Sequence, residues 1–179
     1  KNLLEAKQLK TGQYDVLFDT DVFQSIFNSF SMMLSAKSVI SKTSPWRESL
    51  GQKVTSEKLT FIDSPRYADG FNSYPFDSEG FTKKDNTLVK NGQLKQFIHN
   101  SATAAQLGQV NNFCASRSSK SSLGVGFSNF VIKKGEDSHD KLNSMSYIEI
   151  LKAQGLHSGV RPISGDFSLG VSGRVWNNG

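Results

Sequence analysis

The sequence predicts an α+β domain, because one long helical pattern stands among several short strand patterns. From Val22 to Leu34, apolar residues recur at spacings of three and four, which is the period of one face of a helix. The dipeptide Asn91-Gly92 separates two strand-like runs, and this pair tolerates the positive φ angles of a tight hairpin turn. Further short apolar runs follow toward the end of the chain.

The elements of the first half follow from local signals. Residues 14–18 are predicted to form a short buried strand, and Asp19-Thr20-Asp21 supplies side-chain oxygens that cap the helix that follows. Ser44-Pro45 predicts a short helical turn, and residues 59–62 predict a strand. The stretch 63–86 carries prolines and glycines among aromatic residues, so we expect a long ordered loop with hydrophobic anchors.

The second half is predicted to be richer in strands than in helices. An alanine-rich helix is expected at 101–107, ended by Gly108, with a serine-rich polar stretch after it. Asn178-Gly179 resembles a hairpin turn that lacks its second strand, so we expect the chain to be a fragment of a longer protein. The predicted strands are residues 87–90, 93–98, 130–132, 147–151, 167–171 and 173–176.

Composition excludes several classes of protein. The single cysteine, Cys114, cannot form an internal disulfide and has no zinc-ligand spacing around it; we expect a buried, inert thiol in a cytosolic protein. No apolar run approaches the length of a membrane span. The net charge is +5, but the only adjacent basic pairs are Lys83-Lys84 and Lys133-Lys134, which favours a solvated surface over a nucleic-acid groove.

Residues that carry chemistry are scattered. His99, His139 and His157 are isolated, so no pair has the spacing of a zinc hydrolase, and a surface or hydrogen-bonded role is favoured for each. Of the three, His157 stands out because it lies in a glycine-flanked turn. Asp166 at a strand entry could bind a ligand or orient backbone amides. The acidic pairs, such as Asp77 with Glu79, are interpreted as solvated loop residues.

Seven segments carry a resemblance to a known family. They extend from about Thr11 to the end of the chain. The segments are Thr11-Gly12-x-Tyr14-Asp15-Val16, Leu34-Ser35-Ala36-Lys37-Ser38, Asp77-Ser78-Glu79-Gly80, His99-Asn100-Ser101-Ala102-Thr103-Ala104, Ser118-Ser119-Lys120-Ser121-Ser122-Leu123-Gly124-Val125-Gly126, Gln154-Gly155-Leu156-His157-Ser158-Gly159 and Ile163-Ser164-Gly165-Asp166-Phe167-Ser168. On these segments the chain resembles the TldD/PmbA family and is most similar to its PmbA (TldE) branch.

The resemblance implies a two-domain cytoplasmic protein. Its N-terminal α/β domain is expected to be absent here, and its C-terminal domain is expected to be mainly antiparallel β with a few packed helices. Residues 12–179 would be a truncated part of that C-terminal domain, after a linker or helix end at residues 1–11. Proteins of this family form a heteromeric TldD–TldE zinc peptidase that degrades unfolded or small peptides and takes part in peptide maturation. An older label is modulator of DNA gyrase.

The resemblance also implies that zinc belongs to a partner. The TldD branch carries His-Glu-x-x-x-His on the helix that corresponds to residues 22–38, whereas the matching positions here are Asn28, Ser29 and Met33. Neither Asn nor Met replaces imidazole as a zinc ligand, and a serine cannot act as the carboxylate base. We therefore expect no metal, cofactor or catalytic residue in this chain, and zinc on a TldD-type subunit with which it forms a dimeric assembly.

The expected role of the chain is to shape the cavity in which an extended peptide binds. A peptide could add as a strand through its main-chain hydrogen bonds. Two other functions stay open: a metal-independent hydrolase with Ser119 or Ser122 as nucleophile, Lys120 as base and His157 nearby, and a DNA gyrase-binding module. The candidate groove residues are Ser119, Lys120, Ser122, His157, Ser158 and Asp166.

Overall fold

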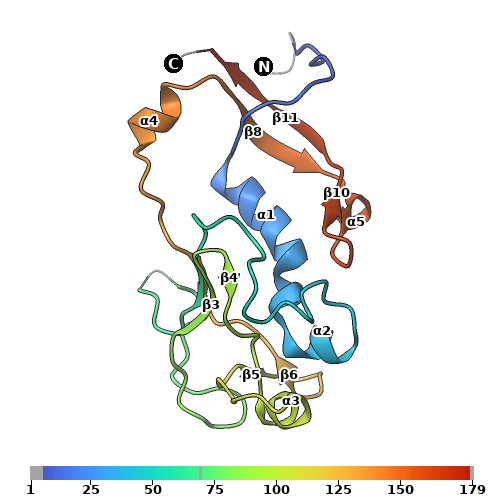
Figure 1. Ribbon diagram of the computed structural model, residues 1–179, viewed down its shortest axis with the longest axis vertical. Coiled ribbons are helices and arrows are strands. Elements are labelled where there is room, and N and C mark those ends of the chain that lie inside the picture. Colours follow the sequence, from blue (N-terminus) through green and yellow to red (C-terminus); the bar gives the residue numbers. More distant parts are fainter. Residues whose placement is uncertain (1–5, 69, 178–179) are drawn as a thin grey trace.

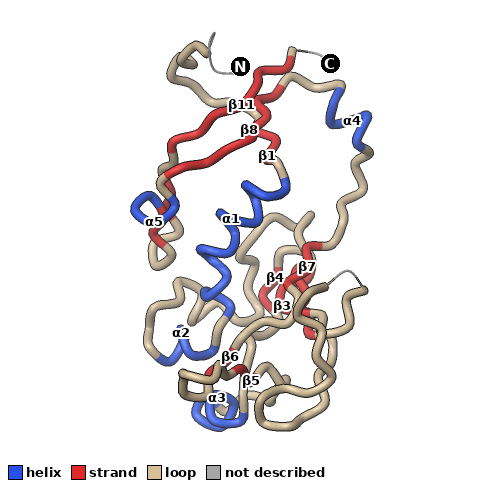
Figure 2. Tube along the Cα trace, turned by 180° about the vertical axis from the view of Figure 1, so that it is seen from behind, coloured by secondary structure: helices blue, strands red, loops and turns tan. Residues whose placement is uncertain are grey.

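A computed structural model describes residues 6–68 and 70–177 of the chain. Its central element is helix α1 (Thr20–Phe30), which lies between an upper and a lower sheet (Figures 1 and 2). The mixture of helices and mostly antiparallel strands confirms the predicted α+β class. The part of the chain that the structure describes has no helix long and apolar enough to cross a membrane.

The upper sheet joins the two ends of the described chain. Its strand order is β1-β8-β11, formed by β1 (Val16–Phe18), β8 (Tyr147–Gln154) and β11 (Gly170–Trp176). β1 runs parallel to β8 and β11 runs antiparallel to it, so this sheet is mixed. Val22 and Ile26 of α1 pack on Ile150 of β8, so one face of this sheet is covered by the helix.

The lower sheet is antiparallel and encloses the larger core. Its order is β4-β3-β2-β7, with β2 (Phe61–Asp63), β3 (Asn86–Lys90), β4 (Gln93–Leu94) and β7 (Phe130–Ile132). Phe27 of α1 lies with its ring centroid 5.3 Å from that of Phe61 and 4.6 Å from that of Phe130. The helix therefore contributes to both cores. The buried lower core consists of Leu34, Ala36, Phe61, Leu88, Val89, Leu94, Phe97, Ile98 and Cys114.

The predicted long helix is interrupted. α1 begins as expected, with the Asp19 side chain accepting a hydrogen bond from the Asp21 N–H at 3.0 Å. It ends at Phe30 and is followed by the 3-10 helix η1 (Ser31–Leu34) and by α2 (Ala36–Ile40). The physical reason is a bridge to a distant part of the chain. Ser35 is extended, and the residues on either side of it bond Ile98: the Leu34 carbonyl accepts from the Ile98 N–H, and the Ala36 N–H donates to the Ile98 carbonyl.

The hairpin is confirmed at its turn and shorter than predicted in its second strand. Asn91 and Gly92 have φ of +48° and +79°, as a tight primed turn requires. β4 ends at Leu94 because the N–H groups of Lys95 and Gln96 both point to the Leu88 carbonyl. The following residues leave the ladder and reach the Ser35 bridge.

Several shorter elements complete the fold. α3 (Ser101–Leu107) has the predicted bounds, with a capping box at its start and Gly108 in the left-handed conformation at its end. The predicted strand 167–171 is divided: Phe167 belongs to β10 (Asp166–Phe167) and residues 170–171 belong to β11, because the backbone breaks at Ser168, whose N–H donates to the Gly159 carbonyl. The elements that the sequence did not predict are β5 (Ala115–Ser116), β6 (Gly124–Val125), α4 (His139–Asn143), α5 (Leu156–Gly159) and β9 (Val160–Arg161).

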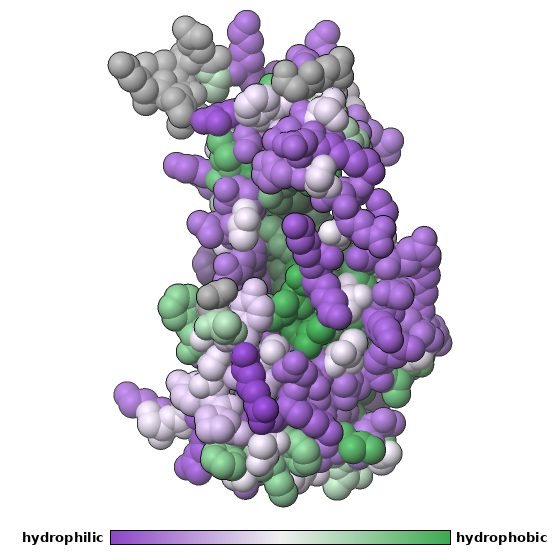
Figure 3. All heavy atoms as spheres, turned by 90° about the vertical axis from the view of Figure 1, so that its left-hand side faces the viewer, coloured by the Kyte–Doolittle hydropathy of each residue, from purple (hydrophilic) through white to green (hydrophobic). Residues whose placement is uncertain are grey.

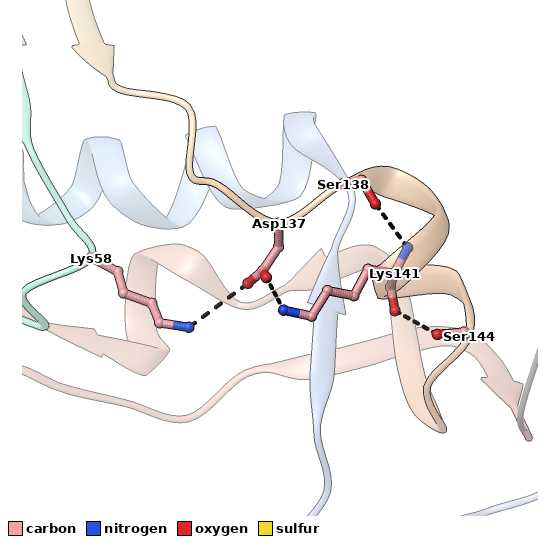
Figure 4. A network of polar contacts seen from close by, with 5 residues as sticks. All are labelled: Lys58, Asp137, Ser138, Lys141 and Ser144. Atoms are coloured by element: carbon pink, nitrogen blue, oxygen red, sulfur yellow. Dashed lines mark hydrogen bonds and ion pairs between the residues drawn. The ribbon is translucent and has the colours of Figure 1, made fainter.

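A charged cluster holds the segment that connects the two sheets. Figure 4 shows Asp137 between the ammonium groups of Lys141 and Lys58, the latter at 3.8 Å. The Ser138 hydroxyl accepts from the Lys141 N–H and begins α4. The hydrogen bond and charge of Lys141 hold the pKa of the Asp137 carboxyl below its usual value. The predicted turn at Asn178-Gly179 lies outside the described residues.

Candidate functional site

The positions that match the zinc motif of the resembling family carry poor zinc donors. Asn28 is exposed near the end of α1, and the Ser29 hydroxyl donates to the Ser25 carbonyl at 3.2 Å. Met33 lies in η1, where its carbonyl accepts from the Ser44 hydroxyl at 2.7 Å. An amide, a back-bonded hydroxyl and a thioether do not fit the nitrogen, thiolate or carboxylate ligands of zinc. Across the described ranges, no group of three His, Cys, Asp or Glu side chains could hold a metal ion.

The first set of predicted groove residues lies on an exposed loop between β5 and β6. Ser119, Lys120 and Ser122 are all exposed. Two other serines of the loop hold it together by hydrogen bonds: the Ser118 N–H and the Ser118 hydroxyl both lie 3.0 Å from the Ser121 hydroxyl. Among the residues that the structure describes, nothing bonds the Lys120 ammonium to either serine, so this geometry offers no activated hydroxyl.

The second set lies around α5. Gly155 has φ of +83° and begins the turn, so this glycine is required by the left-handed backbone conformation there. The Ser158 N–H donates to the Gly155 carbonyl at 3.1 Å, and Asp166 pairs with Arg161 across β10 and β9. His157, Ser158 and Asp166 are exposed. These three positions are therefore accessible to a ligand or to a partner chain.

The structure does not bring the two sets together. Figures 1 and 2 both place α5 beside the upper sheet and β5 and β6 at the lower end of the molecule, and Figure 1 shows β10 next to α5. The six predicted residues therefore form two separate surfaces of this chain rather than one cavity. Figure 3 shows hydrophobic atoms gathered in the middle of one face, between the upper and lower halves.

An apolar groove that the sequence did not predict lies on the upper sheet. It has a volume of about 1020 Å³ and lies between the segment 6–9 and strands β8 and β11. β11 is one of the two edge strands of this sheet, and its Val171 and Val175 are 52% and 54% exposed. An exposed edge with apolar side chains is the geometry to which an extended strand adds.

The acidic pair Asp77 and Glu79 is structural, so its interpretation as solvated loop residues is wrong. One Asp77 oxygen accepts from the N–H groups of Glu79 and Phe81 at 3.0 and 2.9 Å, and the other accepts from Ala115 at 3.2 Å. Glu79 accepts from the N–H and hydroxyl of Ser101 at 3.0 and 2.8 Å. These carboxylates fasten the long loop to β5 and to the start of α3.

A buried polar cluster lies beneath the lower sheet. Asp63 and Cys114 are fully buried, and the Cys114 thiol donates to the Asp63 carboxylate at 3.5 Å. Burial raises the pKa of both groups, and the nearby carboxylate raises that of the thiol further. The thiol therefore stays protonated at neutral pH, and the buried cysteine agrees with the sequence prediction.

His99 is predicted to make the protein less stable in mild acid. It is 3% exposed, and burial lowers its pKa below the ordinary value of 6.5. The unfolded chain therefore takes up a proton first, so the stability contributed by neutral His99 is present above about pH 6.5 and is lost as the pH falls toward the folded pKa. Urea denaturation at pH 7.5 and 5.5 measures this loss. The His99→Gln variant should show a smaller difference between the two pH values, and an equal difference would contradict the prediction.

The comparisons with known proteins identify the family. Residues 11–179 match the model of the PmbA/TldA metallopeptidase C-terminal domain. The chain belongs to the TldD/PmbA family. Its relatives include PmbA proteins, which supports the expected PmbA branch.

Relatives and solved structures agree with this assignment. A metalloprotease of Methanothermobacter thermautotrophicus is 33% identical over 78% of this chain and 31% of its own length. The metalloprotease PmbA of Escherichia coli O157:H7 is 27% identical over 98% and 37%. A Thermotoga maritima structure described as a modulator of a DNA gyrase has a TM-score of 0.88 and 30% identity, with 98% of this chain and 40% of that chain covered.

A further solved structure shares the fold. TldE of Thermococcus kodakarensis has a TM-score of 0.72 and 23% identity, over 79% of this chain and 33% of its own. The chain spans about a third of the length of the curated relatives, 31% of the Methanothermobacter protein and 37% of the Escherichia protein.

Proposed function

We propose that this chain is part of a PmbA (TldE)-like subunit of a cytoplasmic TldD–TldE zinc peptidase that acts on unfolded or small peptides. The observation that carries the proposal is the donor set at Asn28, Ser29 and Met33, which does not fit zinc, in a chain of a metallopeptidase family. The metal and the water that it activates would then belong to a TldD-type partner.

The subunit's role in this proposal is to shape the peptide cavity. The exposed edge of β11 and the apolar groove beside it support binding of an extended chain. The surfaces around α5 and around the β5–β6 loop are exposed and accessible to peptide or partner. Main-chain pairing at a strand edge gives little sequence selectivity, which suits unfolded substrates.

No specific observation favours either alternative function. A serine hydrolase needs a base in contact with its nucleophile, and no such contact involves Ser119, Lys120 or Ser122 in the described ranges. A gyrase-binding role rests on the description of a relative rather than on a basic surface of this chain.

Zinc content and peptidase activity of the full-length protein test the proposal. Alone, the protein should bind no zinc above background and should not cleave an unfolded peptide. Mixed with its TldD-type partner, it should form a complex that contains zinc and cleaves the peptide; a chelator should abolish the activity and added zinc should restore it.

Variants at the degenerate motif provide the control. Asn28→Ala and Met33→Ala should leave the zinc content of the complex unchanged, because these side chains hold no metal in the proposal. Zinc bound by this subunit alone, and lost in these variants, would refute it. Chelator-resistant cleavage by this subunit alone that disappears in Ser119→Ala or Ser122→Ala would favour the hydrolase.

A further inference from the structure

A polar cavity in the lower half contains unused hydrogen-bond donors. It has a volume of about 370 Å³ and lies between the long loop at 72–78, strand β5 and the segment 127–128. Figure 1 labels β5 at the lower end of the molecule, away from the upper sheet and its apolar groove. The cavity is thus separate from the surfaces considered for strand addition.

Lys83 is the central feature of the cavity. The residue is only 8% exposed, although lysine is rarely buried without a partner. It lines the cavity, and its ammonium makes no hydrogen bond or ion pair with any residue that the structure describes. Its electrostatic interactions there are at longer range, with buried Asp63 and with the buried Cys114 thiol. The ammonium itself is not among the fully buried atoms that lack a partner, so it is open to the cavity and free to donate to a bound acceptor.

Ser128 adds a second unused group. It is 6% exposed and lines the cavity, and its hydroxyl oxygen has no hydrogen-bond partner. Its N–H is used, since it donates to Asp63 at 2.6 Å, and this bond fixes the backbone on which the free hydroxyl stands. Arg117 also lines the cavity and makes no ion pair with a described residue.

The acidic groups at the cavity are already engaged. Asp77 lines it, but its carboxylate accepts three backbone N–H bonds. Asp63 lies behind Ser128 and accepts from the Ser128 N–H and the Cys114 thiol. Lysine and arginine can only donate, so the cationic donors exceed the free carboxylates around the cavity, which favours a ligand with acceptor oxygens.

We propose that this cavity binds the carboxylate of a peptide terminus, held by the Lys83 ammonium and the Ser128 hydroxyl. Arg117 supplies further donors at the rim, and Tyr74, Phe76 and Phe127 of the lining contact an apolar side chain next to the carboxylate. The carboxylate site stands on the cavity alone; only the choice of a peptide as its source rests on the proposed function.

Calorimetric titration of the full-length protein with N-acetyl-phenylalanine tests the site. We expect saturable binding that Lys83→Met weakens about 10-fold or more, because a charge-assisted hydrogen bond is removed. Lys84→Met is the matched control, because Lys84 is exposed and lies over the Phe113 ring, with its ammonium 5.4 Å from the centroid, and it should keep the affinity. Ser128→Ala should weaken binding several-fold, which keeps the test valid if Lys83→Met fails to fold.

Two further probes separate the sources of the anion. N-acetyl-phenylalaninamide keeps the ring and lacks the carboxylate, so it should not bind. Inorganic phosphate should bind more weakly than N-acetyl-phenylalanine, because it gains nothing from the aromatic residues. Any of four outcomes would overturn the proposal. These are equal binding of the acid and the amide, phosphate binding as tightly as the acid, no binding of the acid, and full affinity in both Lys83→Met and Ser128→Ala. Because no peptidase activity is measured, failure of the zinc-subunit proposal would not affect these results.

Discussion

Replacing Leu88 by alanine should lower the free energy of unfolding by about 3 kcal/mol, within the usual 2–5 kcal/mol for such truncations in a core. Leu88 is fully buried on β3, where it belongs to the core formed by the lower sheet and the α1–α2 segment. The loss combines the transfer free energy of the deleted methyl groups with the cavity left among rigid neighbours. Urea denaturation of the purified protein, followed by circular dichroism, measures it.

Leu123 provides a control of the same chemistry. It is 41% exposed, so Leu123→Ala should change the free energy of unfolding by no more than about 0.5 kcal/mol. Similar losses in the two variants would mean that Leu88 is less buried in solution than in the structure.

Replacing Gly173 by alanine should destabilise the upper sheet by about 2 kcal/mol or more. Gly173 lies at the register shift between β8 and β11, and an added Cβ would overlap the Glu149 carbonyl oxygen and approach the carbonyl carbon to 2.8 Å. Both atoms belong to the backbone, so the strands themselves must separate. Hydrogen exchange of the β8 amides should report the loosening as faster exchange.

Gly170→Ala in the same strand is the control. The nearest atom to its added Cβ is Gln154 Cβ at 4.0 Å, which is an ordinary contact. The β8 amides should exchange at the unsubstituted rate in this variant. Slow exchange in both variants would show that the β8–β11 pairing tolerates a side chain at Gly173.

Local patterns predicted the elements whose causes are local. The Asp19 cap, the Asn91-Gly92 turn and the α3 helix depend on neighbouring residues, and the structure confirms all three. The break after Phe30 was not predictable from periodicity, because its cause is the bridge between Ser35 and Ile98, which are distant in sequence. The parallel pairing of β1 with β8 is invisible for the same reason.

The candidate site was less accessible to sequence reasoning than the fold. The family resemblance located the zinc-motif positions at Asn28, Ser29 and Met33, and their residue types alone then indicated poor zinc donors. The structural role of Asp77 could not be predicted, because one of its partners, Ala115, lies on another strand. Lys83 and Lys84 are adjacent and chemically identical in the sequence, and only the three-dimensional structure distinguishes the buried one from the exposed one.

The pairing of β1 with β8 sets an order on folding during synthesis. Val16–Phe18 must wait for Ile148–Ile150, roughly 130 residues later, which at about 10 residues per second is on the order of 10 s. During that interval the face of α1 with Val22 and Ile26 lacks its cover, while Phe27 can already join the lower core. The nascent chain therefore presents an uncovered apolar stripe until β8 has been synthesised and can pack on it.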